Sequence, residues 1–312
     1  MADRREKQWT LFSVDDTYIG TDKRNNAHLY QLLHSFSLPL SLFQFAYGGT
    51  VDHEGSTCTV HASDDASDDA PAILNTFDLC GQGGKVFLHD DLYHIESVMK
   101  MTGLKDVTID LTGKLLWGTD IDYWGSHGFE LGFQNQTTSW ILSGDNITFN
   151  GHGIGTLDGQ IWYDFTQGIS NLHNLPITLV IANTTSSHFD GLRIASGRNT
   201  GVDIMFFDKI TLRNWTIAEG DDSISVKANS TNILIQDCIV ITHMMSSDSS
   251  LGQYKGEFEI VENVVAERAK VLGTRYAGLT IYTSLGGGGG IGYAKNITFK
   301  DFTLDGVFDM VA

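Results

Sequence analysis

The chain has 312 residues and a formal net charge of −18, with 38 Asp and Glu against 20 Lys and Arg. Because a surface this acidic repels nucleic acid and anionic membranes, we expect neither as a partner, whereas a polyuronide that is partly protonated in acid remains compatible. Glycine is abundant at 34 residues and proline rare at 3. Together with frequent Asn, Ser and Thr, this is typical of short strands joined by tight turns.

Residues 1–50 match no repeat found further along the chain. Their first half is polar and charged, unlike a signal peptide, but the stretch LLHSFSLPLSLFQFAYGG at 32–49 resembles the apolar core of one. It is either a signal-like stretch set behind an upstream start or an ordinary buried segment. No stretch is apolar and long enough to cross a membrane. We therefore separate an atypical N-terminal segment, 1–50, from one domain, 51–312.

A short helix is predicted near the start of this domain. An aspartate of the run Ser67-Asp68-Asp69 suits the capping position, Pro71 suits the first turn, and Gly81 suits the end. One short helix before a run of strands is typical of the cap that covers the first coil of a solenoid. A plain surface helix is the alternative interpretation, and the two are compatible.

The cysteine count limits the disulfides, and the sequon count favours an extracellular protein. The chain has three cysteines, so at most one disulfide can form, and we expect it between Cys58 and Cys80, which flank the predicted helix. Cys238 then remains a free thiol. Six N-x-[ST] sequons begin at Asn135, Asn146, Asn183, Asn214, Asn229 and Asn296. We therefore expect a secreted glycoprotein.

Strand-like segments of similar form recur along the domain. Several begin with Asn or Lys, continue with alternating apolar and polar residues, and include a turn; the segments are Lys85–Asp90, Lys105–Leu111, Asn146–Gly151, Phe189–Ile194, Lys209–Ile217, Asn232–Val240 and Asn296–Leu304. Alternation of period two indicates strands rather than helices. Unlike the dissimilar strands of a β-sandwich, these segments are near copies, which favours a solenoid of stacked coils, or rungs.

The apolar residues of these segments predict which positions stack. Ile147, Phe189, Ile210 and Ile233 are separated by 42, 21 and 23 residues, which we interpret as two rungs, one and one. Val264 and Ile297 continue the series after longer intervals of 31 and 33 residues, which we interpret as rungs with longer loops. Residues one rung apart lie about 4.8 Å from each other. The prediction is an all-β, single-stranded parallel β-helix with a short N-terminal cap helix.

Two adjacent aspartates, Asp221 and Asp222, follow Gly220 in the sequence EGDDSISVK. Asp203 precedes Asp222 by 19 residues and His243 follows it by 21, close to one rung on either side. We therefore expect the carboxylates and the imidazole to gather on one face, where they could carry out acid/base cleavage of a glycosidic bond. The alternative is a solvated Gly-Asp-Asp turn.

The chain between Asn214 and Glu257, with NWTIAEGDDSISVKANSTNILIQDC and SLGQYKGE, resembles the fungal exo-acting polygalacturonases. The strings TCTVHAS, DDAPAI, LLWGTDIDYW, GTLDGQIWYDF and GGGGGIGYAKNITF are similar to the same relatives in the same order. The resemblance covers residues 57–307. It implies a right-handed parallel β-helix, pectin as the substrate, and inverting hydrolysis of α-linked galacturonic acid from the chain end.

The resemblance assigns roles to the acid pair. The family's Asp-Asp motif is intact as Asp221 and Asp222, which implies that Asp221 is the general acid and Asp222 a base for water. Asp203 matches a second aspartate near the family's Asn-Thr-Asp motif, but no aspartate directly follows Thr200. Inversion needs about 6.5–9.5 Å between acid and base. Acidic neighbours favour the protonated form of the acid.

The other family motifs are altered. His243, expected to tune the acid, is followed by Met244 instead of glycine, and Ala277–Ile281 lacks both cations of the family's Arg-x-Lys. These departures are typical of errors at gene-model boundaries or of a decaying copy. The relatives continue beyond the position of Ala312, so we expect the domain to be truncated at its C-terminus.

Two further residues are candidates for substrate binding. Lys227 would contact a substrate carboxylate, or be a plain exposed lysine, and Tyr254 would stack on a sugar ring, or be a core tyrosine. We expect a monomer that requires neither a metal nor an organic cofactor. The main hypothesis is an exo-acting α-galacturonidase of pectin. The alternatives are an α-L-rhamnosidase acting on rhamnogalacturonan and an inactive β-helix that binds pectin.

Overall fold

The computed structural model describes residues 48–133, 135–160, 176–197, 202–219, 223–242, 247–251, 254, 257–272, 277–283, 291–305 and 309–311. These residues all belong to one unit, Ala46–Ala312. The segment 1–47, which holds most of the signal-like stretch, lies outside the described residues. Within the described part, no helix is long and apolar enough to cross a membrane.

The described part consists almost entirely of short strands. Its two helices are α2 (Ala70–Cys80) and α3 (Ile121–His127). The strands up to the middle of the chain are β1 (Thr50–Glu54), β2 (Thr57–His61), β3 (Lys85–Leu88), β4 (Leu92–Ile95), β5 (Met99–Lys105), β6 (Thr108–Leu111), β7 (Lys114–Trp117), β8 (Phe129–Glu130), β9 (Thr137–Thr138), β10 (Trp140–Asp145), β11 (Thr148–Asn150), β12 (Thr156–Asp158) and β13 (Leu179–Asp190). The later strands are β14 (Arg193–Gly197), β15 (Val202–Met205), β16 (Asp208–Arg213), β17 (Thr216–Glu219), β18 (Ile224–Val226), β19 (Ser230–Gln236), β20 (Ile239–Thr242), β21 (Ser247–Leu251), β22 (Phe258–Glu267), β23 (Lys270–Leu272), β24 (Ala277–Thr283), β25 (Ile291–Lys300), β26 (Thr303–Asp305) and β27 (Asp309–Val311).

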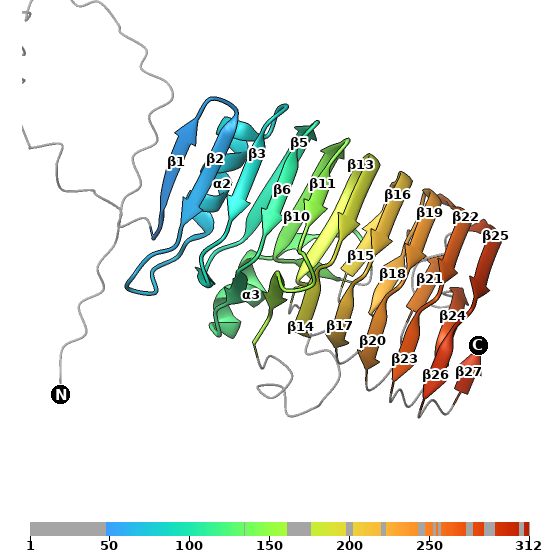
Figure 1. Ribbon diagram of the computed structural model, residues 1–312. Helices are drawn as coiled ribbons and strands as arrows, with labels where there is room; N and C mark the ends of the chain where they lie inside the picture. The colour runs from blue at the N-terminus through green and yellow to red at the C-terminus, as the bar shows by residue number, and fades with distance from the viewer. Residues whose placement is uncertain are drawn as a thin grey trace, which may run out of the picture. The chain divides into compact units, whose positions relative to one another are not determined.

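These strands form the predicted parallel β-helix. Strands of successive rungs pair in parallel, as β16, β19, β22 and β25 do, and Figure 1 shows them side by side in chain order. Each rung contributes strands to a large sheet and one strand to a smaller sheet, which runs from β4 through β14, β17 and β20 to β26. Among the described strands, only β1–β2 and β8–β9 pair antiparallel. The fold prediction is therefore confirmed.

The predicted apolar column exists in the second half of the chain. Ile210 pairs with Ile233, Ile233 with Val264, and Val264 with Ile297. The first three of these side chains are buried, and Ile297 packs against the same core cluster. Because each rung buries its apolar face only against its neighbours, this column holds successive coils in register. The spacings of 31 and 33 residues are single rungs with longer loops, as expected.

The earlier part of the predicted column is wrong. Phe189 stacks between Phe149 and Leu212 in a neighbouring column, while Ser187 occupies the position opposite Ile210. The interval from Ile147 to Phe189 is one rung rather than two, because β11 pairs directly with the end of β13. A long insertion after β12 lengthens this rung, and spacing alone cannot distinguish one long rung from two short ones.

Asparagines form a ladder through one column of bends. Asn232, Asn263 and Asn296 have positive φ angles of 57°, 59° and 56°. The Asn263 amide donates to Asn232 Oδ1 at 3.0 Å, and the Asn296 amide donates to Asn263 Oδ1 at 2.9 Å. Asparagine tolerates this backbone conformation better than other side chains that carry a Cβ. The ladder therefore explains why Asn recurs at the start of the repeated segments.

Helix α2 covers the first rung, as predicted. Its residues Ala70, Ile73 and Phe77 belong to the main core cluster, proline occupies its first turn, and Gly81 is its C-cap. A disulfide joins its last residue, Cys80, to Cys58 in β2. The helix therefore closes the N-terminal end of the apolar core.

Of the two aspartates at the helix start, Asp68 accepts a hydrogen bond at Oδ1 from the Ala70 N–H at 3.1 Å. The side chain of the N-cap residue, Asp69, makes no capping hydrogen bond. Its carboxylate instead accepts hydrogen bonds from the backbone N–H groups of Ser63 at 2.9 Å and His94 at 2.8 Å. Burial of this carboxylate raises its pKa. Asp69 therefore ties two neighbouring segments together rather than satisfying the helix N-terminus.

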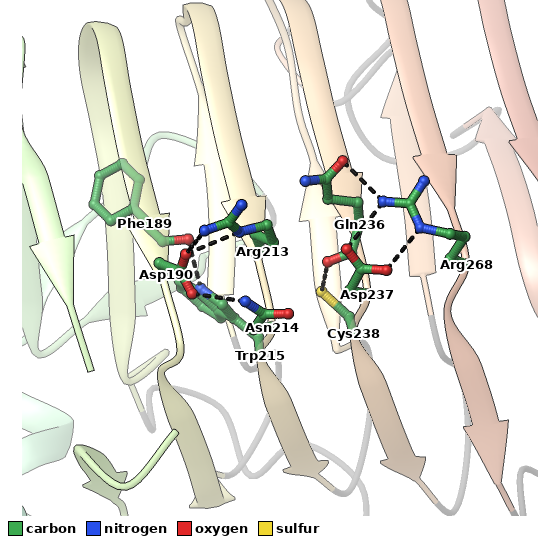
Figure 2. A network of polar contacts seen from close by, with 9 residues as sticks. All are labelled: Phe189, Asp190, Arg213, Asn214, Trp215, Gln236, Asp237, Cys238 and Arg268. Atoms are coloured by element: carbon green, nitrogen blue, oxygen red, sulfur yellow. Dashed lines mark hydrogen bonds and ion pairs between the residues drawn. The ribbon is translucent and has the colours of Figure 1, made fainter. Parts of the chain in front are cut away.

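Charged side chains link the rungs where the large sheet turns into the small one (Figure 2). Arg213 donates to Asp190 on the preceding rung, with Nε at 2.8 Å from Oδ2. Arg268 donates to Asp237 through Nε at 2.7 Å and Nη2 at 2.9 Å. Cys238 lies in this corner with its thiol buried, and burial raises its pKa to about 12. These contacts join neighbouring rungs, and they lie at a different corner from the one where the small sheet leads back to the large sheet.

Candidate active site

Three successive rungs pass from the small sheet back to the large one between strand ends that are in register. At the ends of the small-sheet strands, Gly197, Glu219 and Thr242 pair on successive rungs. At the starts of the next large-sheet strands, Val202, Ile224 and Ser247 also pair. Four residues separate the two sets on each of these three rungs. Three connections of equal length therefore join strand ends that are themselves in register.

These connections contain most of the predicted site. Asp221 and Asp222 belong to the one between Glu219 and Ile224, and His243 begins the next one, directly after Thr242. All three residues lie outside the described residues. In the sequence, each is at most two residues from a paired strand position. Neighbouring rungs in register lie about 4.8 Å apart.

The position one rung after Asp203 is Ser225, not Asp222. Asp203 lies in β15, where it pairs with Val180 on one side and Ser225 on the other. The local rung is 22 residues long, so the 19-residue spacing used in the sequence analysis does not represent one rung.

A further aspartate, which the sequence did not single out, lies in the same row of paired positions as Asp203 and Ser225. Asp248 in β21 pairs with Ser225, which places it two rungs from Asp203, and it pairs on its other side with Thr280. The signal that could have found it is its 23-residue distance from Ser225, the local rung length. The row of aspartates therefore consists of Asp203 and Asp248, with Ser225 between them.

The residue that follows the acid pair is a buried serine. Ser223 is fully buried, and its Oγ has no hydrogen-bond partner among the described atoms. A buried hydroxyl without a partner costs free energy, and such groups concentrate at functional sites. The observation marks this connection as locally unfavourable for stability.

Lys227 is buried rather than exposed. Only 4% of its surface is accessible, and its Nζ lies 5.6 Å from the centroid of the Phe133 ring. This is the distance of a cation–π contact, which is stronger when water is excluded. The alternative of a plain exposed lysine is therefore wrong, and contact with a substrate carboxylate would require the side chain to move.

Tyr254 is packed into a small apolar cluster next to the row of aspartates. Its ring meets that of Phe133 at 5.4 Å and that of Phe206 at 5.9 Å, centroid to centroid. Its hydroxyl donates to the Leu131 carbonyl at 3.3 Å and lies 3.7 Å from Met205 Sδ. Its backbone N–H donates to Glu259 at 2.6 Å. These contacts hold the ring firmly in place.

The same cluster closes one side of the candidate site. Phe133, from the loop of the β8–β9 hairpin, packs with Ile177, Val180, Ala182 and Met205. Val180 and Met205 are almost completely buried although they lie outside the main core. The hairpin and Tyr254 therefore form a wall over this part of the large sheet, immediately beyond Asp203 along β15.

The described part of the chain offers no obvious metal site. The one cluster of metal-ligating atoms found there consists of His53, Cys58 and Cys80. Both sulfurs belong to the disulfide and are therefore not available as thiolates. No cation stands in β24 between Ala277 and Ile281, where the family's Arg-x-Lys is expected.

The fold is a parallel β-helix, and the acidic positions at one of its corners define a candidate carbohydrate-cleaving enzyme. The chain belongs to glycosyl hydrolases family 28, whose model matches residues 194–311. The α-L-rhamnosidase rgxB of Aspergillus niger is 38% identical over 78% of this chain and 67% of its own length. Exopolygalacturonase X of Aspergillus niger is 34% identical over 83% and 68%.

Solved structures agree with the fold. The endo-xylogalacturonan hydrolase of Aspergillus tubingensis superposes with a TM-score of 0.61 at 24% identity, over 80% of this chain and 74% of that one. The polygalacturonase of Erwinia carotovora does so with a TM-score of 0.55 at 17% identity, over 85% and 82%. The chain is therefore a glycosidase-family β-helix.

Proposed function

We propose that this protein is an exo-acting, inverting hydrolase that releases terminal α-linked galacturonic acid from pectin. The observation that carries the proposal is the register of the strand ends on three successive rungs, between which three connections of equal length run and of which the middle one contains the intact Asp-Asp pair. The similarity to an exopolygalacturonase over 83% of the chain supports the same substrate. The wall formed by Phe133 and Tyr254 supports attack at a chain end, because it closes one side of the site.

Each acidic residue has a proposed role. Asp221 donates a proton to the leaving glycosidic oxygen, and nearby negative charge favours its protonated form. Asp222 removes a proton from the attacking water on the opposite face of the sugar, with Asp203 as a second candidate base. His243 begins the adjacent connection and would tune the acid. No step in this mechanism calls for a metal or an organic cofactor.

A second candidate, α-L-rhamnosidase activity on rhamnogalacturonan, is favoured by two observations. The relative with 38% identity is an α-L-rhamnosidase. The strand Ala277–Thr283 also lacks the cations that would hold a galacturonate carboxylate, and a rhamnose has no carboxylate to hold. The sugars that the two activities release differ in the group at C6, a carboxylate against a methyl, and in the configuration of the ring. The substrate test therefore includes both polymers.

We also infer that the protein works outside the cell as a monomeric glycoprotein. The Cys58–Cys80 disulfide supports an oxidising compartment, since such bonds do not persist in a reducing cytosol. The six sequons support passage through the secretory route. Mass spectrometry of protein secreted by a fungal host, before and after glycan removal, tests this inference.

The function is tested by sugar release from purified protein. Wild type is incubated separately with polygalacturonate and with rhamnogalacturonan, and released monosaccharides are identified by chromatography. Asp221→Asn is expected to reduce release by about 10²–10⁴-fold, because it removes the proton donor. Asp301→Asn, an exposed change in a distant bend, serves as the matched control.

The outcomes separate the three hypotheses. Galacturonic acid released by wild type and by the control, but not by Asp221→Asn, supports the main proposal. Rhamnose released in the same pattern supports the second candidate. Equal release by wild type and Asp221→Asn excludes the assigned acid. Binding of a polymer without any release supports an inactive pectin-binding protein instead.

A further inference from the structure

Phe206 has an unusual backbone for an aromatic residue. It lies in the bend between β15 and β16 with a positive φ of 60°. Asn183 occupies the same position on the preceding rung, with a φ of 51°, and Asn229 has a φ of 57° in the bend of the following rung. Asparagine tolerates this left-handed conformation, whereas a bulky side chain is disfavoured there. Phe206 therefore occupies a left-handed bend position at which the neighbouring rungs have asparagine, the residue that tolerates this conformation better.

Packing does not explain the choice of phenylalanine. The side chain remains 37% exposed, although the adjacent Met205 is almost fully buried. Within the described residues its one aromatic neighbour is Tyr254, at 5.9 Å with the rings inclined by 58°. A residue in an unfavourable conformation that leaves an apolar ring in water is typical of a binding surface rather than of a core.

The ring of Phe206 is supported from behind. Tyr254 is itself held by Phe133, by hydrogen bonds to Leu131 and Glu259, and by the Met205 sulfur. Such support matters because a ring with little remaining freedom loses little entropy when a ligand packs on it. The exposed face of Phe206 is thus the open end of the aromatic row Phe133–Tyr254–Phe206.

This aromatic row lies next to the candidate active site but not in it. Phe206 comes three residues after Asp203 and four after Val202, which ends the connection on that rung. At ~3.3 Å per residue, Phe206 is about 13 Å along the strand from that corner. This distance exceeds the width of one pyranose ring. A sugar in contact with Phe206 is therefore a different unit of the chain from a sugar at that corner.

We propose that Phe206 is a substrate-binding residue whose exposed ring packs against the C–H face of a pyranose beyond the one being cleaved in the same chain. A pyranose presents axial C–H groups on its faces and hydroxyls around its rim, so a fixed aromatic ring complements the face. The contact would select oligosaccharides over monosaccharides. The inference rests on the proposed function, and it applies to a galacturonan or a rhamnogalacturonan alike.

The test measures binding without turnover. In an Asp221→Asn background, calorimetry gives the dissociation constants for galacturonic acid and for trigalacturonic acid, and for the matching rhamnogalacturonan oligosaccharide. Phe206→Asn is expected to weaken oligosaccharide binding about tenfold and to leave monosaccharide binding unchanged. Phe206→Trp is expected to restore it. The melting temperature of Phe206→Asn should equal or exceed that of the parent, because asparagine suits the backbone.

The outcomes distinguish this inference from the function on which it rests. If Phe206→Asn binds every oligosaccharide as tightly as its parent does, the binding role of Phe206 is wrong while the proposed function stands. If Phe206→Trp fails to restore affinity, a stacked ring is also excluded. If the parent binds neither oligosaccharide and wild type releases no sugar, both the function and the inference are overturned.

Discussion

Among single residues, Lys227 shows how burial changes an expected role. A lysine near predicted acids suggests a grip on a substrate carboxylate, but here the ammonium lies against the Phe133 ring with 4% of the residue exposed. A long side chain that is buried in this way contributes packing as well as charge. Lys227 therefore fixes the β8–β9 hairpin to the large sheet and supports the wall of the site.

This role predicts an effect on stability. Lys227→Ala should reduce the free energy of unfolding by about 2 kcal/mol, because the cation–π contact and the packed methylenes are lost. Urea denaturation followed by tryptophan fluorescence measures the change. Lys295→Ala, at an exposed lysine of β25, is the matched control and should have little effect. An unchanged stability combined with a higher KM would instead favour direct substrate binding by Lys227.

At the scale of elements, the bends decide how one rung sits on the next. The asparagine ladder combines a backbone conformation that few residues accept with amide hydrogen bonds along the stack. Its two contributions can be separated experimentally. Glycine accepts a positive φ but has no amide, whereas alanine lacks the amide and also resists the conformation.

Substitutions at Asn263 should show both contributions. Asn263→Gly removes the two amide hydrogen bonds and is expected to destabilise the protein by about 1–2 kcal/mol. Asn263→Ala should cost about 1 kcal/mol more, because it adds strain at a φ of 59°. Chemical denaturation of the two variants measures the difference. If alanine is the milder change, the ladder bend does not impose the left-handed conformation in solution.

The ion pairs at the other corner predict a dependence on pH. Hydrogen bonds from Arg268 hold the pKa of Asp237 below its ordinary value. A carboxylate with a lowered pKa stabilises the folded state fully above its unfolded pKa, near 3.9. That stabilisation is lost as the pH falls through the folded pKa.

Asp237→Asn should therefore be less stable than wild type at pH 6, and the gap should narrow as the pH falls below about 4. Melting temperatures between pH 2.5 and 7 measure this convergence. Asp305→Asn, at an exposed position in β26, is the control. Its melting temperature should change with pH in parallel with that of wild type. Parallel curves for Asp237→Asn as well would show that the ion pair with Arg268 contributes nothing in solution.

For the whole molecule, the N-terminal end of the stack is closed by covalent as well as apolar contacts. The Cys58–Cys80 disulfide spans 22 residues and joins the cap helix to β2. A cross-link stabilises mainly by restricting the unfolded chain, and a loop of this length corresponds to about 3 kcal/mol. Since each rung packs only on its neighbours, loosening this end exposes the first rung.

Removal of the bond by Cys58→Ser/Cys80→Ser should therefore lower the melting temperature, and a reductant should lower that of wild type to a similar value. Differential scanning calorimetry of both proteins, with and without reductant, measures the effect. The double variant should not respond to the reductant. A wild type that is equally insensitive would show that the disulfide does not form or does not stabilise the cap.

Sequence periodicity predicted much of this fold because a solenoid is governed by neighbours. The column from Ile210 to Ile297 follows from spacing and alternation, and the cap helix follows from Pro71 and Gly81. The predictions were wrong at positions where the spacing between repeated segments is ambiguous. Phe189 has the right interval but belongs to another column, and the insertion before β13 makes one rung look like two.

The sequence by itself determined the period of the coils, the family and the acid pair, since these depend on residues close together in the chain. Only the tertiary structure decided which residues meet across rungs. It paired Asp203 with Ser225, paired Ser225 in turn with Asp248, and buried Lys227 beneath a ring from a distant hairpin. The physical reason is that a difference of a few residues in one rung shifts a side chain by about 3.3 Å per residue along the strand, and only backbone pairing fixes that shift.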